Sequence, residues 1–293
     1  MTIFKAIILG FVQGVTEFLP ISSSGHLSVF QHFLGTSGEN SLLFSVLLHI
    51  GTLIAVLAVY YKTVIELIKE FFILIRDIFT GKFKFKQMSE PRHMLLMFVI
   101  SCMPLLLLLI PIGGGRNLMD ALGGLAEDKD IFVEGICFLF TAFLLLFGSW
   151  RVKNMKRLRK RVEPKDAVAI GFAQAVAAGF PGISRSGSTI SAGLIRGVSK
   201  GYLVRYSFIL GIPAILAASA VEVKDAVEVG SSLELLPTIV GVLVAAVVGI
   251  AAIKILEWLV KSDKFKFFGY YCLAIGIIVI IAGILEKTGI IAV

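Results

Sequence analysis

Charged residues and cysteines are scarce in this chain, and each shortage excludes a class of protein. Charged residues make up 16% of the 293 positions, whereas 57% are hydrophobic and the mean hydropathy is +0.92. Soluble domains are usually about 45–50% apolar, so the composition predicts an integral membrane protein. Because the few charges cluster between long apolar runs, the pattern favours helices over the alternating strands of a membrane barrel.

The three cysteines, Cys102, Cys137 and Cys272, are far apart and lie in apolar segments. This spacing predicts buried thiols rather than a zinc site or a disulfide framework. No cleavable signal peptide is expected, because the first residues carry Lys5 alone and no A-x-A-like cleavage site. The net charge of +8 does not require a nucleic-acid partner, and none is expected, since surplus Lys and Arg commonly set the orientation of membrane proteins.

One polar motif occurs twice in this apolar background. The first copy, from Gly10 to His26, reads GFVQGVTEFLPISSSGH, and the second, from Gly171 to Gly187, reads GFAQAVAAGFPGISRSG. One inserted residue, Gly182, aligns Ile-Ser-x-Ser-Gly in both copies. Ionisable residues within apolar segments are costly and usually mark a functional site. The duplication therefore predicts two related broken helices that meet in a membrane.

Long apolar stretches predict an all-α polytopic membrane protein. A membrane span needs about 20 predominantly apolar residues. Six transmembrane helices are predicted, at about 42–61, 94–113, 131–152, 203–222, 234–258 and 267–287. Residues 3–35 and 166–199 are broken by Pro and by Ser and Gly, so each is predicted to form a re-entrant helical hairpin that enters and leaves on one side.

The order of these segments predicts an inverted-topology repeat within a single membrane domain, residues 1–293. Three spans separate the hairpins, and an odd number of crossings inverts the second copy. Repeat 1 is expected at about 1–152 and repeat 2 at about 164–288. Residues 62–80 mix charges with apolar positions and are predicted to form an amphipathic helix at the interface. A seventh span is the alternative for this segment.

Loops rich in Lys and Arg alternate with loops that are poor in them, and this alternation orients the chain. The basic loops are 62–93, 151–166 and 254–266, and the others are 114–130 and 223–233. The positive-inside rule places the basic loops in the cytoplasm and both termini outside. Trp150 and Trp258 then fall at cytoplasmic span ends, where aromatic belts form. The two hairpins enter from opposite faces, so their tips can meet near the midplane.

The tips carry residues suited to an anion. Residues 22–25 and 184–187 each begin a short helix, whose free backbone N–H groups and dipole favour a negative group. Arg185 adds a fixed charge whose planar fork suits phosphate oxygens. Ser and Gly can alternatively permit close helix packing, but packing does not account for Arg185, Glu17 and His26.

Glu17 has three alternative roles. Gln13 and Glu17 lie four residues apart and share one helix face. The carboxylate can hold a metal such as Mg²⁺ beside a phosphate, or it can orient His26 in a Ser–His–Glu relay with Ser23 as nucleophile. It can also pair structurally with Arg185.

The other histidines carry a weaker signal. His32 and His93 lie near an interface and a basic loop, and neither is expected to be functional. His49 lies in the first span, beside the first hairpin. A buried histidine with satisfied hydrogen bonds is favoured there over a catalytic one.

The two motifs resemble the signature motifs of the undecaprenyl-diphosphate phosphatase family of bacterial membranes. The stretches that carry the resemblance are Gln13 to His26 and Pro181 to Thr189, and length, span pattern and duplication extend it over the whole chain. The resemblance implies hydrolysis of undecaprenyl diphosphate to the monophosphate, which recycles the carrier for cell-wall synthesis. It also implies bacitracin resistance at raised enzyme levels, a divalent cation (Mg²⁺ or Ca²⁺), and a multi-pass location in the bacterial inner (plasma) membrane, with membrane lipid as surroundings.

The resemblance also assigns site residues. Glu17 matches the essential acid, His26 the motif histidine and Arg185 the diphosphate-binding arginine. The substrate-binding set comprises Gln13, Ser22, Ser24, Gly25, Ser184, Ser186 and Thr189, and Ser23 is the catalytic serine. Many members carry Glu where this chain has Gln13, so the metal is placed mainly on Glu17 and the substrate phosphates.

The expected mechanism is attack by Ser23, activated by His26, on the terminal phosphorus, followed by hydrolysis. His26 as the direct nucleophile is the alternative. A secondary transporter or lipid flippase is the competing function, because inverted repeats with broken helices are typical of transporters. The Ser–His–acid group favours the enzyme. A homodimer is left open as the assembly state.

Overall fold

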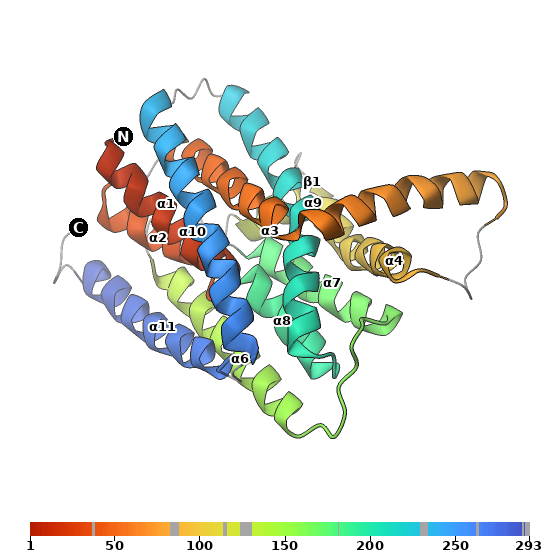
Figure 1. The fold of residues 1–293 in the computed structure, drawn as a ribbon. Helices are drawn as coiled ribbons and strands as arrows, with labels where there is room; N and C mark the ends of the chain where they lie inside the picture. Colours follow the sequence, from red (N-terminus) through yellow and green to blue (C-terminus); the bar gives the residue numbers. More distant parts are fainter. Residues whose placement is uncertain are drawn as a thin grey trace.

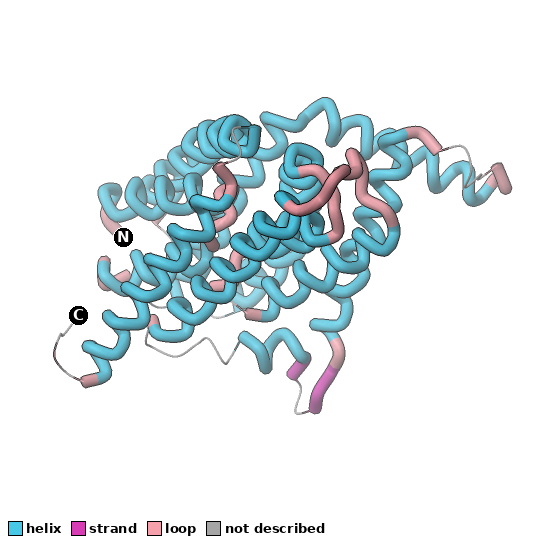
Figure 2. The backbone as a smooth tube through the Cα atoms, turned by 90° about the horizontal axis from the view of Figure 1, so that it is seen from below, coloured by secondary structure: helices cyan, strands magenta, loops and turns pink. Residues whose placement is uncertain are grey.

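Helices form most of the molecule, which is a computed structural model describing residues 1–36, 39–82, 88–113, 116–123, 131–180, 182–228, 234–261, 264–288 and 290 (Figures 1 and 2). Pro181 of the second motif lies outside the described residues. So do 124–130 and 229–233, which belong to the two loops predicted to be poor in Lys and Arg.

Six helices within these ranges are long and apolar enough to cross a membrane, which confirms the predicted all-α polytopic class. They are α3 Glu39–Phe79, α4 Glu90–Cys102 with its 3-10 continuation η1 Met103–Leu109, α6 Phe132–Lys153, α9 Lys200–Glu228, α10 Leu235–Lys261 and α11 Lys266–Lys287. The predicted span 94–113 extends too far. Its last residues form strand β1 Pro111–Gly113, antiparallel to β2 Arg116–Asn117, before the short helix α5 Leu118–Gly123. The 3-10 helix η1 ends at Leu109, because Pro111 has no N–H to donate and Gly113 has a positive φ of 99°.

Helix α3 is longer than the predicted span, because the amphipathic segment 62–80 continues the same helix. The helix bends at Tyr60, where φ is −107° and ψ is 22°. Tyr60 Oη donates a hydrogen bond to Glu257 Oε1 of α10 at 2.7 Å, which ties the bend to the bundle. Figure 1 shows the part after the bend running outward beside α4. The seventh-span alternative finds no support, since one of the six candidate spans already contains this segment.

Two pairs of short helices occupy the predicted hairpins. They are α1 Ile3–Phe18 with α2 Ser23–Phe33, and α7 Pro164–Gly179 with α8 Arg185–Ile195. Both first helices end on a residue with extended backbone, Leu19 and Phe180 respectively. The backbone N–H of Gly182 in the second tip donates to Ser24 Oγ in the first at 3.1 Å. The prediction that the two tips meet is therefore confirmed.

Corresponding glycines fix the first helix of each pair to a membrane span. A Cβ atom added to Gly10 of α1 would lie 2.5 Å from the carbonyl oxygen of Gly241 in α10. A Cβ added to Gly171 of α7 would lie 2.6 Å from the carbonyl oxygen of Ser101 in α4. Small residues allow such close backbone approach between membrane helices. The aligned glycines of the duplicated motif thus position both pairs of short helices.

Gly10→Ala should destabilise the protein by about 1–3 kcal/mol, because the new methyl group meets backbone that cannot rotate away. The measurement is the thermal unfolding midpoint in detergent. Gly201→Ala is the matched control, since a Cβ there has no neighbouring atom within 4 Å. Unfolding midpoints that are equal for Gly10→Ala and the unmodified protein would contradict the packing described.

Candidate functional site

Each helix pair turns at a serine that caps its second helix. Ser22 Oγ accepts a hydrogen bond from the Gly25 N–H at 3.2 Å, and Ser184 Oγ accepts one from the Gly187 N–H at 3.0 Å. Ser22 also has a φ of +73°, which is unusual for a residue with a side chain. Strained backbone of this kind persists where the surrounding structure enforces it, and it clusters at functional sites.

Glu17 lies between the two tips and has polar partners on both carboxylate oxygens. Its Oε1 pairs with Arg185 Nη2 at 2.6 Å. Its Oε2 accepts hydrogen bonds from Ser23 Oγ at 2.6 Å and Gln13 Nε2 at 3.0 Å. His49 Nε2 lies 3.7 Å from the same oxygen. The Glu17 side chain is 5% exposed, so Arg185 supplies the countercharge that a buried carboxylate requires.

Ser23 and Arg185 occupy corresponding positions in the two motif copies. Each is the first residue of its helix, directly after the capping serine. The duplicated backbone therefore presents two different groups, a hydroxyl and a guanidinium, to the two oxygens of one carboxylate. This arrangement explains how a repeated motif can build one asymmetric site.

A cavity of about 190 Å³ opens beside these groups. Its lining comes from the end of α1, from both tips and from α3, α7 and α9. The lining residues are Glu17, Ser23, Ser24, His49, Ala177, Ala178, Ile183, Ser184, Arg185, Ser186, Ala214, Ile215, Ala218 and Ser219. The N-termini of α2 and α8 and the guanidinium of Arg185 give the cavity a positive character that Glu17 offsets in part. Such a cavity suits an anionic group.

His26 does not join the relay predicted for it. Its Nδ1 is 2.7 Å from the carbonyl oxygen of Ser22, and its Nε2 is 2.8 Å from Tyr271 Oη. A carbonyl can only accept, so Nδ1 carries the hydrogen, and Nε2 of the neutral ring accepts from the tyrosine hydroxyl. Ser23 bonds directly to Glu17 instead. The predicted chain of hydrogen bonds from Ser23 through His26 to Glu17 is therefore wrong, because the histidine bonds to Tyr271 of α11 instead.

Ser24 and Ser186, the other serines at the tips, connect the two pairs of short helices. Ser24 Oγ receives the N–H of Gly182, and Ser186 Oγ donates to the carbonyl oxygen of Leu19 at 3.4 Å. Each bond runs from one helix pair to the other. Ser24 and Ser186 also line the cavity, so they combine a structural contact with a position at the site.

Five predicted site residues, Gln13, Ser22, Gly25, His26 and Thr189, do not line the cavity, and Gly25 and Thr189 make packing contacts instead. Thr189 is buried and its Oγ1 is 2.7 Å from Ser207 Oγ of α9. Gly25 allows close packing, since an added Cβ would lie 2.9 Å from the ring of Phe138. These contacts set the position of α8 and α2.

Two residues that the sequence analysis did not assign to the site, His49 and Gly211, contact its charged groups. His49 Nδ1 is 2.9 Å from the Ser45 carbonyl oxygen, and its Nε2 faces Glu17 in the cavity wall. Nδ1 thus has the hydrogen bond that the sequence predicted, but the side chain is half-buried rather than buried, with 28% of it exposed. Gly211 of α9 gives room to Arg185, because any Cβ there would collide with the guanidinium. No signal in the sequence distinguishes Gly211 from other helical glycines.

The oxygen atoms near Glu17 can coordinate a divalent cation only if a bound phosphate group supplies further oxygen ligands. Gln13 Oε1 is buried and has no hydrogen-bond partner in the described structure. No group of three or more His, Cys, Asp or Glu side chains converges on a metal site among the residues that the structure describes. Mg²⁺ typically uses one or two carboxylates together with substrate phosphates. One carboxylate and one amide oxygen match that pattern if phosphates complete it.

Comparisons with known proteins agree over nearly the whole chain. The family described as bacitracin resistance protein BacA matches residues 6–278. A protein named undecaprenyl-diphosphatase from Alkaliphilus metalliredigens is 40% identical over 286 residues, which cover 97% of this chain and 100% of that protein. Proteins of the same name from Methanosphaera stadtmanae and Halothermothrix orenii are 39% and 38% identical, over 97% of this chain and 99% and 100% of theirs.

Proposed function

Because this chain belongs to the bacitracin resistance protein BacA family, we propose that it hydrolyses undecaprenyl diphosphate to undecaprenyl phosphate and inorganic phosphate. The observation that carries the proposal is the position of Glu17 between Ser23 and Arg185 at a small cavity. An acid, a hydroxyl and a phosphate-binding cation are the groups that phosphoryl transfer requires. The reaction recycles the lipid carrier for cell-wall synthesis, and larger amounts of the enzyme favour bacitracin resistance.

The terminal phosphate of the substrate binds between the two helix N-termini. Its negative charge is stabilised by the dipoles of α2 and α8 and by the guanidinium of Arg185. Ser24, Ser184 and Ser186 line the same space and supply hydroxyl groups. Because Gly211 has no side chain, it leaves room for the guanidinium of Arg185. The polyprenyl chain stays in the membrane lipid, so only the polar head needs to enter the site.

Ser23 is the nucleophile and Glu17 is the base that accepts its proton. The 2.6 Å hydrogen bond from Ser23 Oγ to Glu17 Oε2 supports this assignment. The oxygen of Ser23 attacks the terminal phosphorus, and the bond from phosphorus to the bridging oxygen breaks. Undecaprenyl phosphate leaves with the bridging oxygen. Water then cleaves the phosphoserine and releases inorganic phosphate.

His26 and His49 have separate roles in this scheme. The two hydrogen bonds of His26 support a positioning role, because they fix the first turn of α2 against α11. His49 lines the cavity near Glu17, which supports a role in orienting that carboxylate or the phosphate. His26 as direct nucleophile is less favoured because it is not part of the cavity lining.

A divalent cation, Mg²⁺ or Ca²⁺, is a further part of the proposal. Glu17 and Gln13 would hold it together with the phosphates of the substrate. When bound, such an ion offsets charge that develops on phosphate oxygens. The unpartnered Gln13 Oε1 supports this placement.

The inverted repeat and its two re-entrant hairpins are likewise proposed. The packing of α1 on α10 and of α7 on α4 supports the repeat, because each hairpin packs on a span of the other half through the corresponding glycine. Helices α1, α2, α7 and α8 are also too short to count among the candidate spans. We place the protein in the bacterial plasma membrane, as the carrier lipid requires.

Purified protein in detergent should release inorganic phosphate from undecaprenyl diphosphate in the presence of Mg²⁺ or Ca²⁺. A chelator should abolish release, and added cation should restore it. The assay contains no bilayer, so sustained release excludes transport as the only function. The transporter or flippase alternative has no support in the names of the relatives described above. Absence of phosphate release under all cation conditions would overturn the proposal.

A further inference from the structure

An apolar groove with a volume of about 680 Å³ lies between α3, α4 with its continuation η1, and α9. All the described residues that line it are hydrophobic. Given the proposed function, on which this inference rests, we propose that the groove binds the polyprenyl chain of the substrate while the diphosphate occupies the cavity beside Glu17 and Arg185. The chain then stays within the membrane but lies against a defined surface of the protein.

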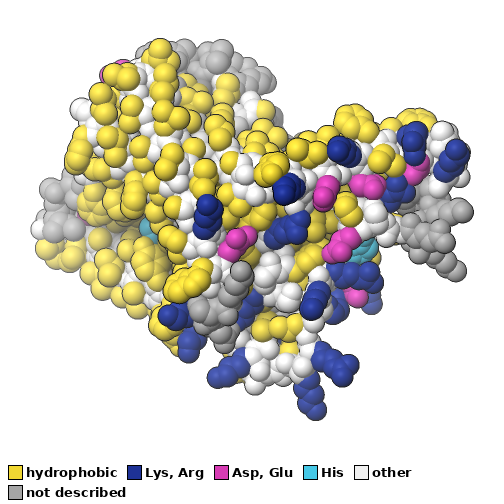
Figure 3. Space-filling model, in the orientation of Figure 1, with side chains coloured by type: hydrophobic (Ala, Val, Ile, Leu, Met, Phe, Trp, Pro, Cys, Tyr) yellow, Lys and Arg dark blue, Asp and Glu magenta, His cyan; other side chains and the backbone are white. Residues whose placement is uncertain are grey.

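The part of α3 after the bend at Tyr60 forms one wall of the groove. Arg92 of α4 holds this wall in place through ion pairs with Glu70 at 3.0 Å and with Asp77 at 2.9 Å. Figure 3 shows apolar side chains along the upper edge of this projecting part and charged side chains below them. Because the ion pairs tie α3 to α4, the fold itself fixes the space between the two helices.

Helix α9 connects the groove to the phosphate-binding site. Gly211 makes room for the guanidinium of Arg185, and the next two residues, Ile212 and Pro213, line the groove. Ala214, which follows them, lines the cavity at the site. A helix advances about 1.5 Å per residue, so the groove and the cavity meet within one turn of α9. A chain that leaves the cavity along α9 therefore reaches the groove directly.

The opposite wall of the cavity borders the same groove. Ala177 and Ala178 of α7 supply small apolar side chains to the cavity lining. Helix α7 packs closely on η1, where a Cβ atom added to Gly171 would lie 2.9 Å from the ring of Pro104. Helix η1 in turn lines the groove with Leu106. The phosphate is held at the polar side of the cavity, so the first isoprene units leave through its apolar side, between α7 and α9.

The groove lining suits a flexible hydrocarbon chain with methyl branches. Phe71, Phe72 and Phe98 line it together with Met103. Methionine is flexible and fills irregular gaps, so it can adapt to a branched chain. Lipid tails are as apolar as the groove, so close packing rather than the hydrophobic effect favours the prenyl chain there. We therefore expect a modest contribution to affinity that depends on the length of the chain.

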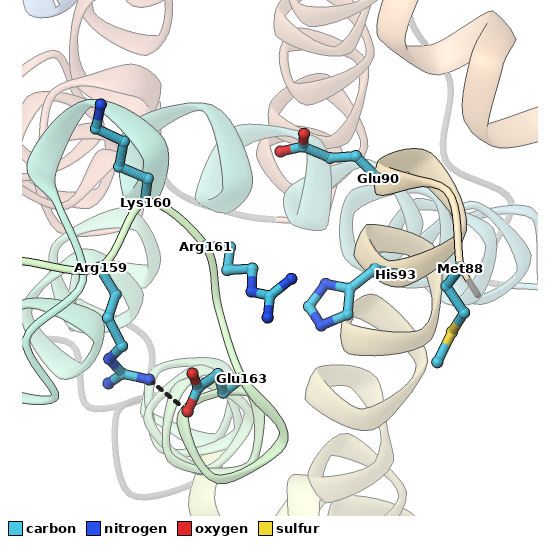
Figure 4. A pocket seen from close by; sticks show the side chains of 7 residues that line it. All are labelled: Met88, Glu90, His93, Arg159, Lys160, Arg161 and Glu163. Atoms are coloured by element: carbon cyan, nitrogen blue, oxygen red, sulfur yellow. Dashed lines mark ion pairs between the residues drawn. The ribbon is translucent and has the colours of Figure 1, made fainter. Parts of the chain in front are cut away.

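The cavity drawn in Figure 4 has a similar volume, about 640 Å³, but its lining does not suit a hydrocarbon chain. Charged side chains dominate it, namely Glu90, Arg159, Lys160, Arg161 and Glu163. Arg159 and Glu163 form an ion pair at 2.9 Å. A prenyl chain in this cavity would remove water from charged groups, which is costly. Of these two spaces, the groove is the one whose chemistry matches the substrate chain.

Val99→Trp combined with Leu106→Trp should fill the groove. Both side chains line it and are 53% and 62% exposed, so the larger rings need not enter the core. In this groove pair, KM for undecaprenyl diphosphate should rise about tenfold, because the chain loses many small packing contacts. The kcat should stay the same, since Glu17, Ser23 and Arg185 are unchanged. A steady-state assay of phosphate release in detergent measures both constants.

Leu243→Trp combined with Val247→Trp is the matched control. These side chains of α10 are 59% and 67% exposed and line neither the groove nor the cavity. The control pair should leave KM unchanged. An equal rise of KM in both pairs, or an unchanged KM in the groove pair, would overturn the proposal while the proposed reaction stands.

Binding of undecaprenyl phosphate, the product of the proposed reaction, provides a second test that needs no turnover. This lipid should raise the thermal unfolding midpoint of the unmodified protein and of the control pair in detergent, and raise that of the groove pair much less. Geranyl phosphate, whose chain is too short to lie along the groove, should have a small effect on all three proteins. The same pattern without any phosphate release would support the groove and overturn the proposed reaction. Equal stabilisation by phosphatidylglycerol, also lost in the groove pair, would assign the groove to ordinary acyl chains and overturn the proposal.

Discussion

Ser23→Ala should lower kcat for phosphate release by at least about a thousandfold, because it removes the proposed nucleophile from a site whose other groups remain. The hydroxyl donates to Glu17 Oε2 at 2.6 Å, and water cannot take the same covalent role. KM should change much less than kcat, since Arg185 and the two helix N-termini still hold the phosphate. The measurement is a steady-state assay of phosphate release with undecaprenyl diphosphate in detergent.

Ser24→Ala is the control for this experiment. Ser24 lies next to Ser23 in the cavity lining, but its hydroxyl accepts the Gly182 N–H rather than contacting Glu17. Its loss should cost far less activity. Acid quenching of the unmodified enzyme during turnover should also trap phosphate on Ser23, and digestion with peptide mapping would locate it. Phosphate found on His26, or a kcat for Ser23→Ala close to that of Ser24→Ala, would remove the serine mechanism.

Arg185→Gln should destabilise the protein by about 3–5 kcal/mol and abolish phosphate release. Without the guanidinium, Glu17 is a buried carboxylate without a countercharge, and this situation is costly in a membrane protein. Glu17→Gln combined with Arg185→Gln should regain most of that stability, because the two neutral amides leave no buried charge. The double variant should remain inactive. Thermal or SDS-induced unfolding in detergent measures the first effect, and phosphate release measures the second.

Measuring both stability and activity in the double variant distinguishes a structural ion pair from a functional one. A purely structural pair predicts that restored stability also restores activity, whereas a pair that belongs to the site predicts stable and inactive protein. Arg76→Gln serves as the control, since Arg76 pairs with Asp77 at 3.1 Å but its side chain is 68% exposed. Surface pairs of this kind contribute about 0–1 kcal/mol, so its unfolding midpoint should hardly move. A loss in Arg76→Gln equal to that in Arg185→Gln would contradict the role of burial.

The helix pairs could be predicted because their signals are local. Pro20 and the Ser/Gly runs interrupt helices wherever they occur, and a polar motif in an apolar segment stands out without knowledge of its neighbours. The alignment of Ser23 with Arg185 also came from sequence, and the structure places both on Glu17. By contrast, α3 continues through Tyr60 because helix hydrogen bonding and the contact with Glu257 carry the chain past the expected span end.

The sequence by itself determined the membrane class, the six spans and the identity of the tip residues, because apolar length, charge and turn chemistry depend on neighbouring positions in the chain. Only the tertiary structure decided the partners of the histidines and the room for Arg185. His26 bonds to Tyr271, 245 positions away, and Gly211 on a different helix makes space for the guanidinium. Such contacts depend on how distant helices pack, and a single sequence carries no periodic or local signal for them.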